Sequence, residues 1–361
     1  MISSCWLPSA IACCFCLPLL HGHGTHRSTR IPNQGGMPTS RLLDSDRKIT
    51  SIQFIGSHNA GANTDSSLSN VFNCFTRNQN LTFAQMLRLG VRYFDIDLCY
   101  HQGVLKFCHS HSPYNEWTSH FFNRLETALI QMKAFLRENP NEILLLHFNR
   151  DWHAYGPPGN KRKMAKALYQ MLNQYFADLM FPLDQFYALN QRVPTVGEMW
   201  NASRPIIIFL QKELYQLGRQ ELGLEVTRGP VISENWIEII YMAYRAVYAA
   251  GAPQKALIRN KKLGLVDMRC RQSEAPFIDF QVIGRLYTLQ YCIHHIDNAT
   301  KSILPDALAS CRQARCNASE SDRAVNFLTL DFVESAPVNL YEVYNFGDCT
   351  KPYPVSLDNH L

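Results

Sequence analysis

The sequence predicts an α/β fold of the TIM-like (β/α) barrel type, and three observations support this prediction. Five short apolar runs have the composition of strands that are buried on both faces, and longer amphipathic stretches separate them. No glycine-rich phosphate loop follows any of these runs. Hydrophobic residues make up 46% of the 361 residues and charged residues 18%, so the chain can bury a large core.

The strand and helix patterns alternate along the chain. We predict strands over 52–55, 91–98, 142–148, 204–210 and 327–333. Helical spacing of apolar residues predicts helices over 81–89, 121–136, 164–176 and 237–250. Weaker strand patterns at 231–233, 263–266 and 277–282 would complete eight strands, the number that closes a barrel. An open doubly wound sheet is the alternative, and the missing phosphate loop makes it the less favoured one.

The first residues have the pattern of a signal peptide. An apolar run over 6–20 is too short to span a bilayer but fits a signal-peptide core, so we assign 1–22 to a signal peptide. A short N-terminal anchor is the alternative. We expect 23–47 to be a flexible lead-in, because it is rich in Gly, Ser, Thr and Arg and lacks periodicity. The remaining residues, 48–361, are predicted to form one barrel domain.

Cysteines and glycosylation motifs independently favour a secreted, extracellular glycoprotein. Eight of the 12 cysteines lie beyond the predicted signal peptide, an even number that is compatible with disulfides. Two of them, Cys99 and Cys108, flank an apparent hairpin around 101–103. Asn-x-Ser/Thr motifs occur at Asn80, Asn201, Asn298 and Asn317.

The charge balance excludes a nucleic-acid-binding protein. The net charge is +5, from 35 basic and 30 acidic residues, and the longest basic cluster, 161–163, fits a solvated helix start. Nucleic-acid recognition needs many Lys and Arg side chains on one face. The small basic surplus suits an anionic partner such as a phosphate group or a lipid surface.

Polar side chains gather where the predicted strands end. His58 and Asn59 follow the first strand, Asp95 and Asp97 lie in the second, and Asp331 lies in the last. Beyond the hairpin and the third strand come further polar residues: His109, His111, His147, Asn149, Arg150 and Asp151. Barrel enzymes build their sites at the carboxyl ends of strands, so this distribution is typical of a catalytic face.

The residue types in this group suit acid–base and metal chemistry. Two histidines can exchange protons with a substrate near neutral pH, one accepting and the other donating. Asp95 and Asp97 alternate in a strand, so they project to one face and require a cation there, either an Arg or a metal. With Asn59 they offer oxygen donors that suit Ca²⁺ or Mg²⁺ better than zinc. A single histidine or aspartate at a strand end is more often structural, but five such strand ends together indicate a hydrolytic site.

These segments resemble the catalytic X region of phosphatidylinositol-specific phospholipases C and of the PLC X-domain-containing proteins. The resemblance covers 52–152 well, has a second anchor near Asp331, and extends over 156–324 only in general layout. The motifs that carry it are 57–59 (SHN), 89–97 (LGVRYFDID), 107–111 (FCHSH), 141–149 (NEILLLHFN) and 330–333 (LDFV).

The resemblance implies a barrel of the PLC-like phosphodiesterase type, distorted or incompletely closed, that cleaves inositol phospholipids. His58 resembles the general base that takes the proton of the inositol 2-hydroxyl, and His109 the general acid that protonates the leaving glycerol oxygen. His111 is the alternative acid, and Asp331 resembles the carboxylate that orients the base. We expect Arg92, Arg150 and His111 to contact the substrate.

The resemblance also implies a metal. Calcium-dependent members have an Asn after the first His and two acidic residues one apart, so Asn59, Asp95 and Asp97 are the expected Ca²⁺ ligands. The chain departs from the family at the fourth ligand, where it has His147 in place of an acid, and Asn149 or Asp151 is the alternative donor. It also has Ser110 where a Gly is usual.

We therefore expect a secreted, monomeric phosphodiesterase that acts at a membrane surface on phosphatidylinositol or on glycosylphosphatidylinositol (GPI) anchors. One alternative is a glycerophosphodiester or sphingomyelin-type phosphodiesterase. Another is a secreted barrel that binds phospholipid head groups or a partner protein without cleavage. The aromatic stretch 114–117 is a possible membrane contact.

Overall fold

The computed structural model describes eight segments and the single residue 333: 45–63, 77–110, 119–150, 159–222, 231–233, 237–245, 277–285, 327–330 and 333. All of them belong to one compact unit, Gly35–Leu361. The predicted signal peptide 1–22, the lead-in up to residue 44 and the predicted strand 263–266 lie outside the described residues.

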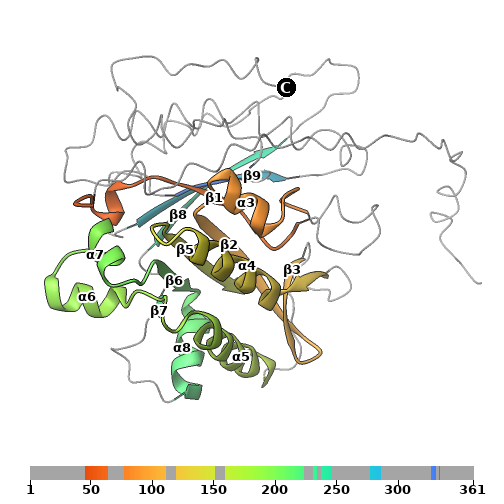
Figure 1. Cartoon of the computed structure of the whole chain (residues 1–361). Helices are drawn as coiled ribbons and strands as arrows, with labels where there is room; N and C mark the ends of the chain where they lie inside the picture. Colours follow the sequence, from red (N-terminus) through yellow and green to blue (C-terminus); the bar gives the residue numbers. More distant parts are fainter. Residues whose placement is uncertain are drawn as a thin grey trace, which may run out of the picture. The chain divides into compact units, whose positions relative to one another are not determined.

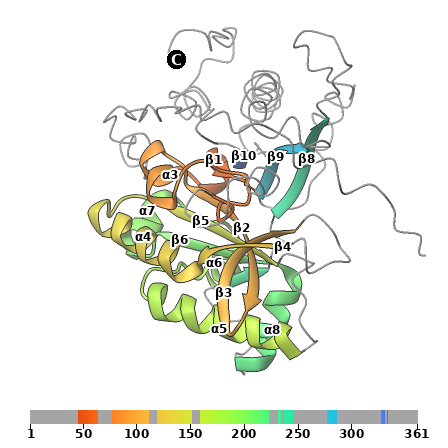
Figure 2. The ribbon, with the colours of Figure 1, turned by 90° about the vertical axis from the view of Figure 1, so that its right-hand side faces the viewer.

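Eight parallel strands form a single path whose order follows the chain, except that the last of them pairs with the first (Figure 2). The last described strand pairs with the first, in a register that runs from Phe54–Phe327 to Ser57–Leu330. This serial order is that of a barrel, whereas a doubly wound sheet would reverse its order near the middle. The strands are β1 (Phe54–Ser57), β2 (Tyr93–His101), β5 (Leu144–Arg150), β6 (Ile206–Leu210), β7 (Val231–Ser233), β8 (Ile237–Arg245), β9 (Phe277–Arg285) and β10 (Phe327–Leu330).

The barrel has one seam, between β7 and β8. Within the segments described above, no strand pairing joins these two ends of the path. Both strands run in the same direction, and only residues 234–236 separate them, too few for a crossover helix. The expectation of a distorted, incompletely closed barrel is therefore confirmed.

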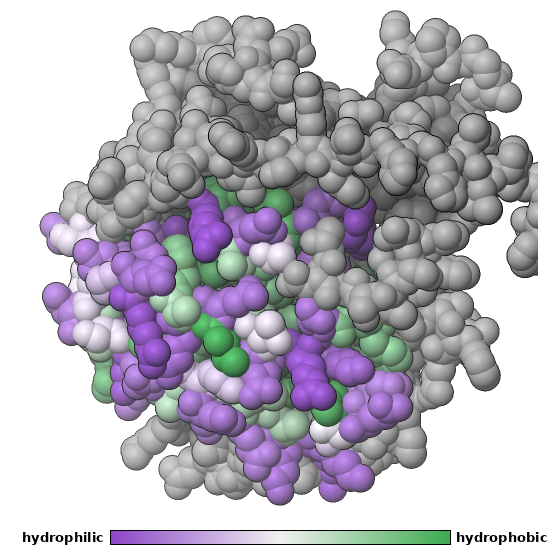
Figure 3. Space-filling model, turned by 45° about the vertical axis from the view of Figure 1, so that its right-hand side comes forward, coloured by the Kyte–Doolittle hydropathy of each residue, from purple (hydrophilic) through white to green (hydrophobic). Residues whose placement is uncertain are grey.

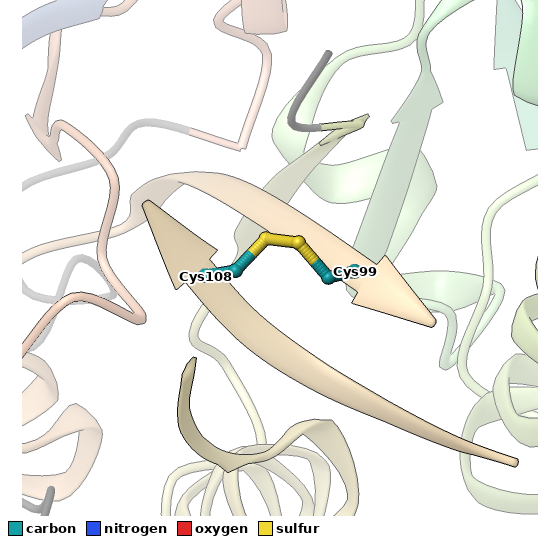
Figure 4. Close-up of a disulfide and its surroundings, with 2 residues drawn as sticks. All are labelled: Cys99 and Cys108. Atoms are coloured by element: carbon teal, nitrogen blue, oxygen red, sulfur yellow. A yellow bond between two sulfur atoms is a disulfide. The ribbon is translucent and has the colours of Figure 1, made fainter. Parts of the chain in front are cut away.

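An antiparallel arm extends from β2. Strand β3 (Val104–Ser110) folds back on β2 around the predicted hairpin, and β4 (Ser119–Arg124) pairs with β3. A disulfide joins Cys99 of β2 to Cys108 of β3, the two cysteines that flank the predicted hairpin (Figure 4). The bond fixes the strand that carries His109, the next residue after Cys108.

Helices α3 (Phe83–Leu89), α4 (Leu125–Glu138) and α5 (Gly159–Phe176) cover the outer face of the sheet (Figure 1). They bury the alternate residues of three central strands: Phe94, Ile96 and Leu98 of β2, Leu144, Leu146 and Phe148 of β5, and Ile206, Ile208 and Leu210 of β6. Helix α3 begins at a capping box formed by Thr82 and Gln85 and ends at Gly90, whose φ of 102° suits glycine.

Helix α8 (Lys212–Leu222) packs closely on α5. Gly218 makes this approach possible, because a Cβ at this position would overlap the ring of Tyr169. The pKa of the Tyr169 hydroxyl is raised far above its usual range, mainly by burial, so this hydroxyl stays neutral between the helices.

A second core cluster lies on the inner face, which is the face opposite to α3, α4 and α5. Phe54, Tyr93, Leu145, Ile207 and Phe209 face residues from η1 (Ile49–Ser51), α6 (Leu183–Asn190) and α7 (Val196–Asn201). Their alternation along β2 and β5 places Asp95, Asp97, His147 and Asn149 on this same inner face.

Helix α7 begins at a second capping box, formed by Thr195 and Glu198. Arg192 donates two hydrogen bonds to the Glu198 carboxylate, at 2.8 and 2.5 Å. The pKa of Glu198 is lowered from 4.5 to about 2, mainly by these hydrogen bonds.

Two predicted helices differ from the structure. Residues 237–245 form β8, so the prediction of a helix over 237–250 is wrong for these residues. Seven of the nine residues in β8 are apolar, and a run apolar on both sides cannot be distinguished from a buried helix by periodicity. The helix predicted from residue 121 begins at Leu125, because 119–124 pair with β3 as β4. The weak strands predicted at 231–233 and 277–282 are confirmed.

The described surface carries few large apolar side chains. Ile130, Tyr187 and Leu189 are the exposed ones among the described residues. On the face drawn in Figure 3, hydrophobic residues lie scattered among hydrophilic ones. No helix in the described segments is long and apolar enough to cross a membrane.

Candidate active site

The turn after β1 is held between the two neighbouring strands. The backbone N–H of His58 donates to the carbonyl of Leu330 on β10, at 3.0 Å, and that of Ala60 donates to the carbonyl of Asp95 on β2, at 2.7 Å. Asn59 lies between them with a φ of 41°, in the left-handed region that Asn tolerates better than most residues. The side chain of His58 is thereby presented at the carboxyl end of β1.

Asp95 lies at the centre of the polar inner face and is 3% exposed. Its Oδ1 accepts a hydrogen bond from the Asn149 side chain at 2.5 Å and lies 3.6 Å from Nδ1 of His147. Its Oδ2 accepts from the backbone N–H of Asn59 at 3.4 Å and lies 3.9 Å from Nε2 of His58. This buried carboxylate therefore connects β1, β2 and β5 and faces both histidines that border it.

A single carboxamide, that of Asn78, contacts both of the histidines predicted to be catalytic. Its Oδ1 lies 2.7 Å from Nδ1 of His109, and its Nδ2 lies 3.4 Å from Nδ1 of His58. The structure thus brings His58 and His109, which are 51 residues apart in the chain, into one hydrogen-bonded group.

Gln79 anchors this group to the barrel and is completely buried. Its Nε2 donates to the carbonyls of His58 and Leu330, each at 2.8 Å, and its Oε1 accepts from the backbone N–H of Val333 at 3.0 Å. Gln79 therefore links the turn after β1 to the end of β10.

The arm with His109 lies close to the turn with His58 because of a glycine. A Cβ at Gly61 would overlap the side chain of Phe107 on β3. Phe107 in turn stacks on Phe83 of α3, with ring centroids 5.2 Å apart. Gly61 and the Cys99–Cys108 disulfide together define how closely β3 approaches the first turn.

Two of the predicted metal ligands, Asp95 and Asp97, lie on β2, and the third, Asn59, lies in the turn after β1. In the β2–β5 register, Asp95 is opposite His147 and Asp97 is opposite Asn149. The Asn59 carboxamide is 1% exposed, and neither its oxygen nor its nitrogen has a hydrogen-bond partner among the described residues. A buried amide oxygen without a hydrogen-bond partner, on the residue whose backbone N–H donates to Asp95, fits an oxygen-coordinated cation. The described residues contain no cluster of three His, Cys, Asp or Glu side chains able to hold a metal, so Asn donors would be needed.

Arg92 was predicted to bind substrate, and this prediction is wrong. Arg92 precedes β2, is 2% exposed, and pairs with the buried carboxylate of Glu142 at 2.7 Å. It also donates to the carbonyls of Leu87 and Val91 and stacks over the ring of Phe135. Its side chain is therefore engaged under the outer helices, on the face opposite to Asp95.

Several predicted residues fall outside what the structure describes. Asp331, His111 and Asp151 are not described, and only the backbone of Arg150 is described, at the end of β5. The roles assigned to them stay predictions. Leu330, the residue before Asp331, is the backbone partner of His58.

Sequence reasoning missed Asn78 and Gln79. The only signal is a polar run at 77–80 (RNQN) directly before a helix, and a solvated loop has the same composition. Their importance follows from burial, which composition does not reveal: they are 7% and 0% exposed.

Fold and site together define a parallel α/β barrel that gathers a histidine pair and a buried carboxylate near the carboxyl ends of its first strands. The family model described as PI-PLC X 1 matches residues 45–218, so this part of the chain is similar to the PI-PLC X family. The matched segment includes every described residue of the site except those at the end of β10.

The relatives among curated proteins are distant. The mouse PI-PLC X domain-containing protein 2 is 26% identical over 142 residues, which are 38% of this chain and 36% of that protein. The human protein of the same name is 25% identical over 142 residues, or 38% of this chain and 40% of that protein. The match thus spans well under half of the length of these relatives.

Solved structures show the same fold. The phosphatidylinositol-specific phospholipase C from Listeria monocytogenes aligns with a TM-score of 0.51 at 13% identity, over 85% of this chain and 96% of that one. The F249X mutant of the phospholipase C from Staphylococcus aureus aligns with a TM-score of 0.50 at 14% identity, over 87% and 98%. Since identity is this low, these neighbours establish the barrel and not its chemistry.

Proposed function

We propose that this chain is a phosphoric diester hydrolase that cleaves phosphatidylinositol or GPI-type lipids by paired histidine acid–base catalysis. Family and fold both support a phospholipase C-like phosphodiesterase. The observation that carries the finer proposal is the side-chain group His58–Asn78–His109 beside the buried Asp95. A barrel that only bound a head group would not need two histidines joined in this way.

In the proposed reaction, His58 takes the proton of the inositol 2-hydroxyl, and that oxygen attacks phosphorus. The bond from phosphorus to the glycerol oxygen breaks, and His109 donates a proton to the departing oxygen. The products are a cyclic inositol phosphate and diacylglycerol. Water can then open the ring with the two histidines in reversed roles. Asp331, which follows the backbone partner of His58, is proposed to orient the base.

We propose Ca²⁺ as the cofactor, held by Asn59, Asp95 and Asp97. The buried Asn59 oxygen and the two carboxylates are the oxygen donors that this ion prefers. The cation would offset the negative charge of the phosphate when bound. His147, which faces Asp95 in the register, stands where an acidic ligand would otherwise add affinity, so weak binding is expected.

Catalysis is tested with labelled phosphatidylinositol in detergent micelles, with release of cyclic inositol phosphate as the readout. We expect turnover by the wild type and a loss of at least about 100-fold in His58→Ala and His109→Ala. His101→Ala is the matched control, because His101 stacks on Phe121 of the arm and makes no described contact with the two histidines. Equal rates for the wild type and His58→Ala would overturn the mechanism.

Substrate class is tested by offering a GPI-anchored protein, sphingomyelin and glycerophosphoinositol in parallel. Cleavage of the first with phosphatidylinositol supports the proposal. Preference for either of the other two, or tight lipid binding without cleavage, would replace it with one of the alternatives.

The metal is tested by thermal unfolding as well as by activity. Added CaCl₂ should raise the melting temperature of the wild type and not that of Asp97→Asn, because only a bound ion stabilises the folded state. Chelation should abolish turnover, and chelator-insensitive activity would exclude the calcium proposal.

Secretion, glycosylation and a monomeric state complete the proposal. The signal-like start, the disulfide and the motif at Asn201, which is exposed at the end of α7, support it. Expression in animal cells should give a secreted protein whose apparent mass falls after enzymatic deglycosylation. Retention inside the cell without a mass change would contradict this part.

A further inference from the structure

The His58–Asn78–His109 group has an asymmetry that the proposed mechanism does not use. The contact between Asn78 Oδ1 and His109 Nδ1 is short, at 2.7 Å, whereas that between Asn78 Nδ2 and His58 Nδ1 is long, at 3.4 Å. A carboxamide has one accepting end and one donating end. Its accepting end therefore faces His109.

The position of this carboxamide is fixed by the backbone around it. The N–H groups of Asn78 and Gln79 both donate to the carbonyl of Ala62, at 2.9 and 3.1 Å. The Gln79 side chain holds the same segment to His58 and Leu330. Because Asn78 is 7% exposed, solvent cannot easily replace it as a partner of the histidine.

An oxygen at Nδ1 has a direct chemical consequence for His109. The contact requires a proton on Nδ1, so Nε2 is the ring nitrogen that remains for exchange with a substrate. A protonated His109 carries N–H groups on both nitrogens, and only an acceptor such as Oδ1 can satisfy the one on Nδ1. A carboxylate often plays this part beside a catalytic histidine, and the described residues place an amide there instead.

We propose that Asn78 is a positioning residue that fixes the ring orientation and tautomer of His109 for donation of a proton to the leaving group. The proposal rests on the proposed function, in which His109 is the acid. Asn78 itself does not exchange protons. It ensures that Nε2 of His109 carries the transferred proton and that its ring cannot turn away.

The decisive experiment compares two leaving groups. Diacylglycerol is an alkoxide leaving group and needs protonation, whereas 4-nitrophenolate leaves without it. With phosphatidylinositol, Asn78→Ala should lower kcat about 10- to 100-fold, the usual effect of losing an orienting partner, with KM changed by less than about 3-fold. With 4-nitrophenyl inositol phosphate, the same variant should retain kcat within about 3-fold. An equal loss on both substrates would mean that Asn78 is merely structural.

Two further variants keep the result interpretable. Asn78→Asp retains an acceptor at His109 and should restore most of the activity towards phosphatidylinositol. Asn190→Ala is the matched control, because Asn190 is exposed at the end of α6 and its side chain caps only the carbonyl of Phe186. Failure of Asn78→Asp to exceed Asn78→Ala would also overturn the proposal.

A spectroscopic test does not depend on activity. In protein labelled with ¹⁵N-histidine, the His109 signals, assigned with a His109→Gln variant, should have the pattern of an Nδ1–H imidazole when neutral. They should shift towards a tautomer mixture in Asn78→Ala. An Nε2–H pattern in the wild type would contradict the inference. Inactivity of the wild type on both substrates would instead count against the proposed function, and the NMR result would stand separately.

Discussion

Replacement of Arg92 by methionine tests whether this residue stabilises the fold through its buried ion pair with Glu142, rather than binding substrate as the sequence predicted. Methionine has a comparable length but no charge, so Arg92→Met leaves the carboxylate of Glu142 buried, at 1% exposure, without its cation. Two backbone carbonyls also lose their donor, at the end of α3 and just before β2. Removing one partner of a buried ion pair costs about 3–5 kcal/mol. That is at least about a fifth of the stability of an ordinary domain, about 5–15 kcal/mol.

The assay is urea unfolding followed by tryptophan fluorescence, with KM measured in parallel on any folded variant. Arg88→Met is the matched control, because Arg88 is exposed in the last turn of α3, and we expect its stability to stay within about 0.5 kcal/mol of wild type. The double variant Arg92→Met/Glu142→Leu removes both charges and should recover part of the loss. If Arg92→Met unfolded like the wild type and raised KM, Arg92 would bind substrate and our interpretation of the buried pair would be refuted.

Three other predictions concern stability and use the same unfolding assay. Replacing Cys99 and Cys108 together by Ala should cost about 2.5 kcal/mol, the chain-entropy value for a separation of 9 residues, and an unchanged midpoint would mean that the bond does not form. Gly218→Ala should destabilise the protein by about 1–3 kcal/mol, because the added Cβ overlaps α5 even though alanine favours a helix. The control Gln216→Ala, at an exposed position of the same helix, should leave the stability unchanged. A Gly218→Ala variant more stable than the wild type would refute the close packing. Glu198→Gln keeps the capping acceptor but loses the ion pair, so it should cost no more than about 1 kcal/mol at pH 7. Because the pKa of Glu198 is lowered, the difference from wild type should be present above pH 4.5 and vanish as the pH falls towards 2, and a difference that persisted at pH 2 would contradict this.

The serial barrel could be predicted from the sequence because its central strands are short and apolar on both faces. The runs at 142–148 and 204–210 contain β5 and β6 almost completely. The prediction failed at β8, where a nine-residue apolar run has no period to distinguish strand from helix and only pairing with β9 decides. It also failed at β4, whose residues carry helical spacing and become a strand because β3 lies beside them.

The site was predictable where its residues follow apolar strands, and not elsewhere. His58 and Asp95 could be grouped because strand ends meet on one face of a barrel, whereas His109, in the antiparallel strand β3, was assigned from the family resemblance of its motif. Arg92 was assigned wrongly because sequence position does not distinguish the two ends of a strand, and the residue one place before β2 faces the helices. Asn78 could not be found at all, since its role depends on burial and on contacts made across 20 and 31 residues of chain.

The strands that carry the candidate site differ from those that form the seam, and this separation suits the proposed proton transfer. The strands that carry the site, β10, β1, β2 and β5, are paired without interruption. Two side chains link these same strands. Asp95 bonds to the turn after β1 and to β5, and Gln79 bonds to that turn and to the end of β10. The seam between β7 and β8 lies on the other part of the path. Positions of acid and base must hold to a fraction of an ångström for proton transfer, so an incomplete barrel can support catalysis only if its break is remote from them. The order of strands in this chain satisfies that condition.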